Sequence, residues 1–194
     1  GISLVMDGRM LIGVFTGPVE AAWEKAVELS AQVNIIQVEK TFQTVIACVP
    51  PCFKDLWTGA KCMAKLEGVV ADGGTLVLYA PHIQQPSLSH GDWHLKIGYH
   101  LRQYVLENLE SFRDVPKVVL GDLIQLRGTG VVENGQELPR FRVVLASAIS
   151  EDDCMQMNLV YQDPCSIKVE DYEGRQEQGI LVVRDAGEKL WKLI

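Results

Sequence analysis

The chain has 194 residues, of which 47% are hydrophobic and 22% charged, an ordinary composition for a globular protein long enough to build its own core. Its formal net charge of -7 disfavours a nucleic-acid or an anionic membrane partner, because both call for a basic face. No apolar run is long enough to span a bilayer, and the first residues are too few and too polar for a signal peptide, so we expect a cytoplasmic protein.

The chain opens with two predicted strands and a helix. Residues 2–6 and 10–15 are strand-like, and a turn at Thr16-Gly17-Pro18 leads into a helix that reaches Ala31. We expect this helix to bury one face, formed by Val19, Trp23, Ala26 and Val27. A strand-like start without a polar leader is what a segment of a longer polypeptide would show.

Strands and helices then alternate. Residues 33–38 and 44–49 are β-rich, and the second run is almost unbroken apolar sequence, which predicts a central strand ended by Pro50-Pro51. Residues 53–70 predict a helix, and residues 75–80 a buried strand after a break at Gly73-Gly74. Strand, helix and strand in this order imply a parallel crossover of right-handed sense.

In the remainder of the chain, the predicted strands and helices follow one another less regularly. Residues 95–112 predict a third helix with one apolar face, formed by Ile97, Leu101, Tyr104, Val105, Leu109 and Phe112. Asn134-Gly135 predicts a hairpin, and Ser150 a helix cap. The other strand-like runs are residues 118–126, 141–148, 166–169 and 180–183. The predicted fold class is α/β, with a mixed, partly parallel sheet and flanking helices.

All four histidines fall between residues 82 and 100, directly after the strand predicted at 75–80. Open α/β sheets place ligand sites at the carboxyl ends of their strands. His82 leaves that strand, and an acid/base or ligand role there competes with a hydrogen bond to the following loop. His90 and His94 are four residues apart and would share a metal on a helix, but Asp92 between them is better placed as an N-cap.

Other metal-binding residue types give weaker signals. The five cysteines are an odd number in apolar contexts, which favours reduced, buried thiols. Cys48 and Cys52 with a histidine would be a zinc site, although no second cysteine pair supports it. His100 falls inside the predicted third helix, where we expect a half-buried histidine with its hydrogen bonds satisfied.

Lys61 lies one helical turn beyond Trp57 and Thr58, so the three side chains can share a face of the second predicted helix. Its neighbours Ala60 and Cys62 are small or apolar. A lysine half-sunk among them could clamp a carboxylate or a phosphate. The alternative is a lysine that extends along the helix edge and keeps its ammonium in water.

Several runs of sequence, in their order and spacing, resemble the carboxyl-terminal domain of lactate-racemase-like proteins, the nickel-pincer hydroxyacid racemases and their relatives. The runs are LWTGAK at 56–61, GVVADGGTLVLYAPHI at 68–83, SHG at 89–91, IGYHLRQY at 97–104, RFRVVLASAI at 140–149, NLVYQDP at 158–164 and DAGEKLW at 185–191. Since they cover nearly the whole chain, the resemblance implies that residues 1–194 form a single domain of this kind.

The resemblance also implies which residues line a site. In that family, the aromatic, polar and lysine residues of the pattern Tyr-Gln-x-x-Lys face the active-site cleft and contact the substrate or the pincer nucleotide. The matching positions are Trp57, Thr58 and Lys61. The lysine is kept and the other two are replaced, which implies a hydroxyacid other than lactate. His82 and His90 would line the same cleft.

The family's cofactor-tethering lysine, metal-binding histidine and acid/base histidine pair belong to its amino-terminal domain, which nothing in this chain resembles. The resemblance therefore implies one wall of a two-domain site: an isomerase fragment that is inactive alone, partnered by its own amino-terminal domain and by a small hydroxyacid. The nickel-pincer nucleotide would be held mainly by that other domain, with no cofactor, metal or catalytic residue in this chain. Two alternatives stay open, a non-catalytic small-ligand-binding or interaction domain and a metal-dependent hydrolase that uses the histidines.

Overall fold

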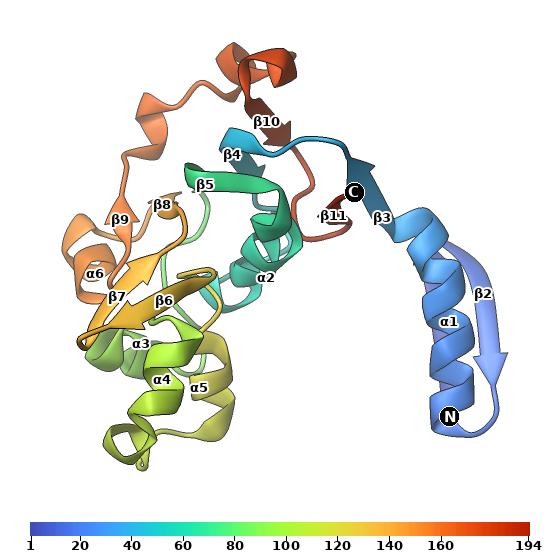
Figure 1. Cartoon of the computed structure of the whole chain (residues 1–194), viewed down its shortest axis with the longest axis horizontal. Helices are drawn as coiled ribbons and strands as arrows, with labels where there is room; N and C mark the ends of the chain where they lie inside the picture. Colours follow the sequence, from blue (N-terminus) through green and yellow to red (C-terminus); the bar gives the residue numbers. More distant parts are fainter.

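A five-stranded sheet forms the centre of the molecule in a computed structural model that describes all residues, Gly1–Ile194 (Figure 1). Every pair of neighbouring strands in it is parallel. In spatial order, the strands are β10 (Ile180–Val183), β4 (Phe42–Cys48), β5 (Val70–Ala80), β8 (Arg142–Ser147) and β9 (Val160–Tyr161). The α/β class is confirmed. Antiparallel pairing is confined to two hairpins outside this sheet.

Helices cover one face of the sheet. They are α2 (Leu56–Leu66), α3 (Gly91–Ile97), α4 (Arg102–Glu107), α5 (Lys117–Leu123) and α6 (Glu151–Gln156). The main core, of 31 buried residues, lies between these helices and the sheet. A second cluster of 7 residues lies on the opposite face, where the segment 164–172, which contains two 3₁₀ turns, supplies the cover through Ile167 and Val169. The 3₁₀ turns of the chain are Glu67–Val69, Leu109–Phe112, Pro164–Ser166, Val169–Tyr172 and Gln176–Gln178.

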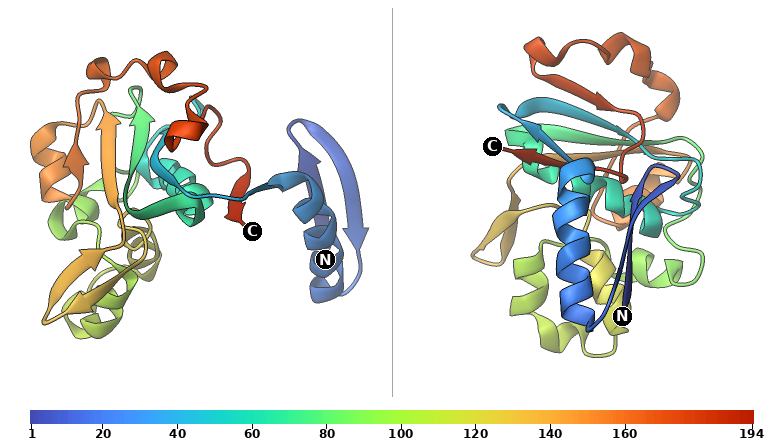
Figure 2. Two further views of the ribbon diagram at one scale, coloured as in Figure 1. Left: turned by 45° about the horizontal axis from the view of Figure 1, so that its top comes forward. Right: turned by 90° about the vertical axis from the view of Figure 1, so that its right-hand side faces the viewer.

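The first 34 residues form a unit that projects from the rest of the molecule (Figure 1). In this N-terminal unit, the hairpin of β1 (Ile2–Asp7) and β2 (Met10–Thr16) lies along α1 (Val19–Asn34). The helix continues into β3 (Ile35–Val38), which pairs in parallel with β11 (Leu190–Leu193). The views in Figure 2 show this junction beside the body of the protein.

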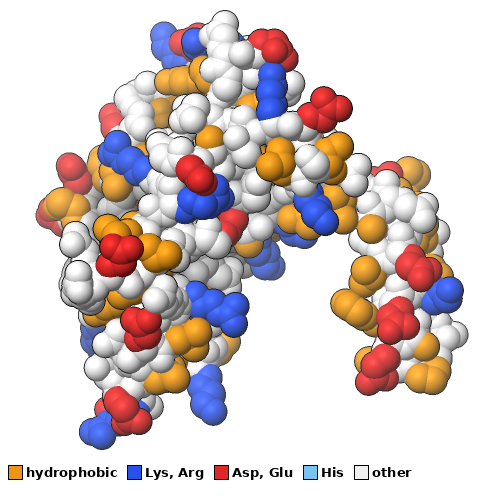
Figure 3. All heavy atoms as spheres, viewed as in Figure 1, with side chains coloured by type: hydrophobic (Ala, Val, Ile, Leu, Met, Phe, Trp, Pro, Cys, Tyr) orange, Lys and Arg blue, Asp and Glu red, His pale blue; other side chains and the backbone are white.

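The prediction of which residues α1 buries is wrong for three of the four residues named, and only Ala26 is buried as expected. Ala22 and Ala26 are buried against the hairpin, but Val19, Trp23 and Val27 are exposed by 66%, 60% and 43%. Their face carries no cover because the hairpin packs only on the alanine side. Figure 3 shows hydrophobic side chains open to solvent on this unit and a gap between it and the body.

Two further expectations about secondary structure are wrong. The segment 95–112 is not one helix, because Gly98 has φ 82° and ends α3, and a separate short helix, α4, follows. The segment 118–126 is not a strand, because residues 117–123 form α5, which buries Val119 and Leu123 in the main core.

Smaller differences concern element boundaries. The strand β5 starts at Val70 and runs through Gly73-Gly74, where its pairing with β4 is irregular. A Cβ at Gly74 would lie 2.9 Å from two carbonyl oxygens, so these glycines permit the irregularity. Residues 166–169 form no strand: Ser166 ends one 3₁₀ turn, Val169 begins the next, and the two residues between them belong to neither.

The predicted hairpin at Asn134-Gly135 and the predicted helix cap at Ser150 are confirmed. Asn134 and Gly135 have φ of 52° and 77° and join β6 (Gly130–Glu133) to β7 (Gln136–Pro139), the geometry that a two-residue hairpin turn requires. The hydroxyl of Ser150 accepts from the N–H of Asp153 and caps α6. None of the helices combines the length and the apolar character that a membrane span requires.

Candidate functional site

The amino-terminal turn of α2 lies at the carboxyl edge of the sheet, between the ends of β4 and β5. The helix begins at Leu56 rather than near Phe53, because Asp55 caps it. One oxygen of the buried Asp55 carboxylate accepts from the N–H of Thr58 at 3.0 Å and from its hydroxyl at 2.7 Å. The other accepts from the N–H of Leu88 at 3.0 Å. The cap therefore also ties the helix to the loop that follows β5.

The Asp55 carboxylate is held in its charged form. Burial acts to raise its pKa, but the N–H of Leu88 and the hydroxyl and N–H of Thr58 all donate to the charged carboxylate. Together these hydrogen bonds hold the pKa of Asp55 below its ordinary value of 3.8. The Thr58 hydroxyl already donates to Asp55, so toward a ligand it can only accept.

Replacing Asp55 with alanine is expected to lower the free energy of unfolding by about 1–2 kcal/mol near neutral pH, since a helix cap and a tie between two segments are both lost. A lowered folded-state pKa stabilises the protein above the unfolded-state pKa, and this contribution disappears as the pH falls through the folded-state value. Urea unfolding near neutral pH and well below pH 3.8 should therefore show a smaller difference between the two proteins in acid. An equal difference at both pH values would contradict the assignment.

Lys61 and His82 both meet Phe53. Lys61 is exposed on the next turn of α2, with its Nζ 5.8 Å from the centre of the Phe53 ring, and it makes no ion pair or hydrogen bond. His82 is half-buried, and its Nε2 lies 3.0 Å from the carbonyl oxygen of Phe53. Because a carbonyl only accepts, Nε2 carries the hydrogen of that bond, and Nδ1 is left without a protein partner. The sequence had not pointed to Phe53.

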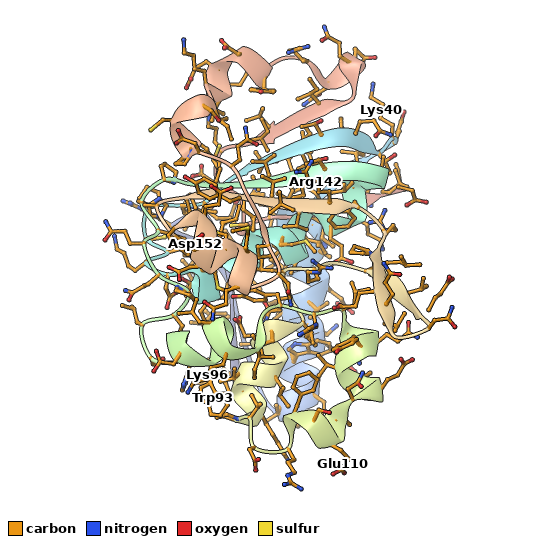
Figure 4. All side chains as sticks on the ribbon, turned by 90° about the vertical axis from the view of Figure 1, so that its left-hand side faces the viewer. Lys40, Trp93, Lys96, Glu110, Arg142 and Asp152 are labelled. Atoms are coloured by element: carbon orange, nitrogen blue, oxygen red, sulfur yellow. The ribbon has the colours of Figure 1, made fainter.

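Trp57 and His90 form the adjoining part of the edge. Their ring centroids lie 5.4 Å apart, and Trp57 also packs against the main core. The N–H of His90 donates to the hydroxyl of Ser87 at 3.2 Å. His90 lines a hollow of about 530 Å³ whose wall includes Trp93 and Lys96, which project from α3 in Figure 4. Two sets of contacts therefore adjoin the first turns of α2: Lys61 and His82 around Phe53, and Trp57 with His90.

His94 lies beneath this wall in a buried polar network. Its Nε2 is 2.7 Å from Oδ2 of Asp122, and its Nδ1 is 3.0 Å from the carbonyl oxygen of His90. The Tyr99 hydroxyl donates to the same Asp122 oxygen at 3.3 Å. Burial, reinforced by the charge of Asp122, raises the pKa of Tyr99 well above its ordinary value, so the hydroxyl stays protonated. The Trp57 and His94 rings pack edge to face, with their centroids 5.7 Å apart.

Three predictions made from the sequence, for His94, Asp92 and His100, can be compared with the contacts in this region. Both ring nitrogens of His94 face protein acceptors, which leaves neither free to share a metal with His90. Asp92 is not the N-cap of α3, because the helix begins at Gly91 and His90 takes the cap position. His100 lies outside any helix, and its nitrogens face Glu137 at 2.8 Å and the Ile97 carbonyl at 3.1 Å. It is half-buried and satisfied, as expected.

Metal-ligating side chains do not gather anywhere in the structure. No group of three or more histidine, cysteine, aspartate or glutamate residues is arranged to hold a metal ion. Cys48 is buried and Cys52 exposed, with no histidine completing a set. None of the five cysteines forms a disulfide, but the expectation that all are buried is wrong, because Cys52 and Cys165 are exposed.

Solved structures share this architecture. A protein from Thermotoga maritima, known from a structural genomics crystal structure, is 31% identical with a TM-score of 0.86, over 100% of this chain and 48% of that chain. The lactate racemase apoprotein from Thermoanaerobacterium thermosaccharolyticum is 15% identical with a TM-score of 0.64, over 97% of this chain and 44% of that chain. The chain has a lactate-racemase-like fold. Models of known protein families and curated protein sequences give no match.

The lengths of these proteins are informative. The chain spans about half the length of each of these two proteins. In both, the matching part is therefore joined to a further stretch of polypeptide of comparable size. At 15% identity, the likeness to lactate racemase concerns the fold, and function has to come from the residues at the carboxyl edge.

Proposed function

We propose that residues 1–194 form the carboxyl-terminal domain of a nickel-pincer-dependent 2-hydroxyacid racemase or epimerase and supply one wall of its active site. The observation that carries this proposal is the state of Lys61: an exposed ammonium without an anionic partner, at the carboxyl edge of a parallel sheet. It stands at the position that corresponds to the cleft lysine of the resembling family. Its partner in the working protein would be the carboxylate of a hydroxyacid or a phosphate of the cofactor.

The neighbouring side chains complement such a ligand. His82 Nδ1 has no protein partner, so in the neutral ring it can accept a hydrogen bond from a substrate hydroxyl. Trp57 and His90 offer a half-buried aromatic surface, with their rings tilted by 40°, near the same end of α2. The Thr58 hydroxyl can only accept, because Asp55 takes its hydrogen. Charge pairing with Lys61 strengthens when a second domain closes over this edge and excludes water.

The residues of this chain fit the anionic parts of the cofactor but not its metal. Side chains here form no metal-ligating group, so we assign the nickel and its tether to the amino-terminal domain. In such enzymes, the bound cofactor supplies the acceptor for the substrate hydride. We assign no residue of this chain to that step: Lys61, Trp57, Thr58, His82 and His90 bind and orient.

A partner domain is also supported by the N-terminal unit. The face of α1 formed by Val19, Trp23 and Val27 is exposed, and apolar surface of this kind marks a site of association. The solved proteins of this fold have roughly as much polypeptide again as the part that matches. We propose that the amino-terminal domain of the same protein covers this face.

The test is racemisation by the complete polypeptide. The 194 residues joined to their amino-terminal domain and loaded with cofactor are expected to interconvert the enantiomers of at least one member of a 2-hydroxyacid panel, followed by chiral chromatography. The 194 residues alone are expected to be inactive. An inert complete protein, with saturable binding of a hydroxyacid to these residues alone, would favour the non-catalytic binding domain. Stoichiometric zinc on the histidines would favour the hydrolase.

A further inference from the structure

A second hollow, of about 430 Å³, opens at the opposite edge of the central sheet. Its wall includes Gly73 near the start of β5, Arg142 at the start of β8 and Val160 at the start of β9. These are the amino ends of parallel strands, whereas Lys61 and His82 lie beyond the carboxyl ends. At about 3.3 Å per residue, the six residues of β8 separate the two edges by roughly 20 Å.

The charge of this hollow is unusual for the chain. The whole protein carries a formal net charge of -7, yet three arginines and no acidic residue line the hollow. One of them, Arg140, has a structural role. Its guanidinium donates to the carbonyl oxygens of Val70 at 2.7 Å and Glu67 at 2.8 Å, and to the Asp72 carboxylate at 2.9 Å. Arg140 is therefore neutralised by Asp72 and fixes the wall.

The other two arginines are not neutralised. Arg127 donates from Nη1 to the carbonyl oxygen of Asn158 at 2.7 Å, but its Nε is buried and has no hydrogen-bond partner. Arg142 is exposed and makes no ion pair or hydrogen bond with its side chain; Figure 4 shows it beside the sheet, away from Trp93 and Lys96. A buried N–H without an acceptor is unfavourable, so Arg127 carries hydrogen-bonding capacity that the fold itself does not satisfy.

The remaining wall is largely apolar. Phe141, Val143, Leu159 and Val160 contribute to it beside the arginines. A guanidinium matches the paired oxygens of a carboxylate or phosphate, and apolar side chains match a hydrocarbon or an aromatic ring. The combination is complementary to a small molecule with an anionic group at one end and an apolar body at the other.

We propose that this hollow, the amino-edge site, binds a small organic anion whose carboxylate or phosphate contacts Arg127 and Arg142 and whose apolar body lies on the wall around Phe141. The site is separate from the edge that carries Lys61. Binding at the amino-edge site can therefore be tested independently of the proposed racemase function.

Isothermal titration of the protein with four probes tests the proposal. Phenyl phosphate and benzoate carry both features, inorganic phosphate carries only the anion, and benzyl alcohol carries only the ring. One or both of the aromatic anions should saturate a single site and bind at least about tenfold more tightly than the other two probes, since both groups then find partners. Which aromatic anion binds more tightly identifies the preferred oxyanion.

Substitutions locate the binding. Arg142→Gln should weaken it by about tenfold or more, the loss expected for one charged hydrogen-bonded contact, and Arg127→Gln should weaken it similarly. Arg142 has no side-chain partner within the fold, so its variant remains informative even if Arg127→Gln destabilises the protein. The matched control is Arg113→Gln, because the Arg113 side chain is 75% exposed and does not line the hollow. Absence of saturable binding by both aromatic anions, or equal affinities before and after Arg142→Gln, would overturn the proposal.

Discussion

Replacing Asp122 with alanine is expected to lower the free energy of unfolding by about 3–5 kcal/mol, because two buried groups would lose the oxygen that they share. Asp122 and His94 are 2% and 0% exposed, and their side chains meet at 2.7 Å. Both the His94 ring and the Tyr99 hydroxyl point donors at the same carboxylate oxygen. Alanine would leave these donors buried without an acceptor. Urea unfolding followed by circular dichroism measures the loss.

Two matched variants separate the causes. Asp114→Ala removes an exposed carboxylate whose nearest basic nitrogen, on Arg113, is 3.7 Å away, and it should cost less than about 1 kcal/mol. Asp122→Asn keeps an oxygen acceptor without the charge, so its loss should fall between the other two. If Asp122→Ala cost no more than Asp114→Ala, the buried network would not be a source of stability.

The same network positions the wall of the candidate site. The His94 ring packs against Trp57, and its Nδ1 hydrogen-bonds to the carbonyl oxygen of His90. Asp122 orients His94 from the opposite side of the ring. Loss of Asp122 should therefore also loosen the 85–90 loop. We regard Asp122 as a positioning residue.

The sheet could be predicted from the sequence because its strands carry strong local signals. Residues 44–49 and 141–148 are almost unbroken apolar runs, and strands buried on both faces of a parallel sheet require such runs. The hairpin at Asn134-Gly135 was equally clear, since two consecutive left-handed residues are needed there and this pair adopts them readily.

The helices were harder to predict, because distant contacts decide them. The β-branched Val118 and Val119 favour a strand locally, yet Val119 and Leu123 pack together into the main core as successive turns of a helix. In the segment 95–112 the apolar spacing continues across Gly98, which hides the break. A Cβ at Gly98 would lie 2.6 Å from the amide nitrogen of Asn158, a clash that no periodicity reveals.

The position of the histidines relative to the sheet was predictable from the sequence, but their contacts were not. His82 and His90 lie beyond the carboxyl edge of the sheet and flank the start of α2, as expected, while their binding of a ligand stays a prediction. His94 and His100 instead pair with acids 28 and 37 residues away in sequence, pairings that local spacing cannot show. The burial of α1 was mispredicted for a related reason, because a sequence pattern reveals an apolar face but not which polypeptide covers it.

Lys61→Ala in the complete, cofactor-loaded protein is expected to lower kcat/KM for the preferred hydroxyacid by roughly ten- to a hundredfold, the loss of one charged hydrogen-bonded contact in a closed cleft. In the structure the Lys61 ammonium has no anionic partner, and its Nζ lies 5.8 Å from the centre of the Phe53 ring. The fold gains little from it, so thermal unfolding should be unchanged. Initial rates of racemisation across substrate concentrations give the result.

Two controls make the interpretation specific. Lys65→Ala removes the same charge one turn further along α2, at a half-buried position beside Ser30 and Asn34 of the N-terminal unit, and should leave kcat/KM within about twofold because it lies farther from the carboxyl edge of the sheet. Lys61→Arg keeps the charge but changes its shape, so it should recover part of the lost rate. If Lys61→Ala and Lys65→Ala had equal rates, Lys61 would not contact the substrate or cofactor, and the carboxyl edge would be a wall without a binding cation.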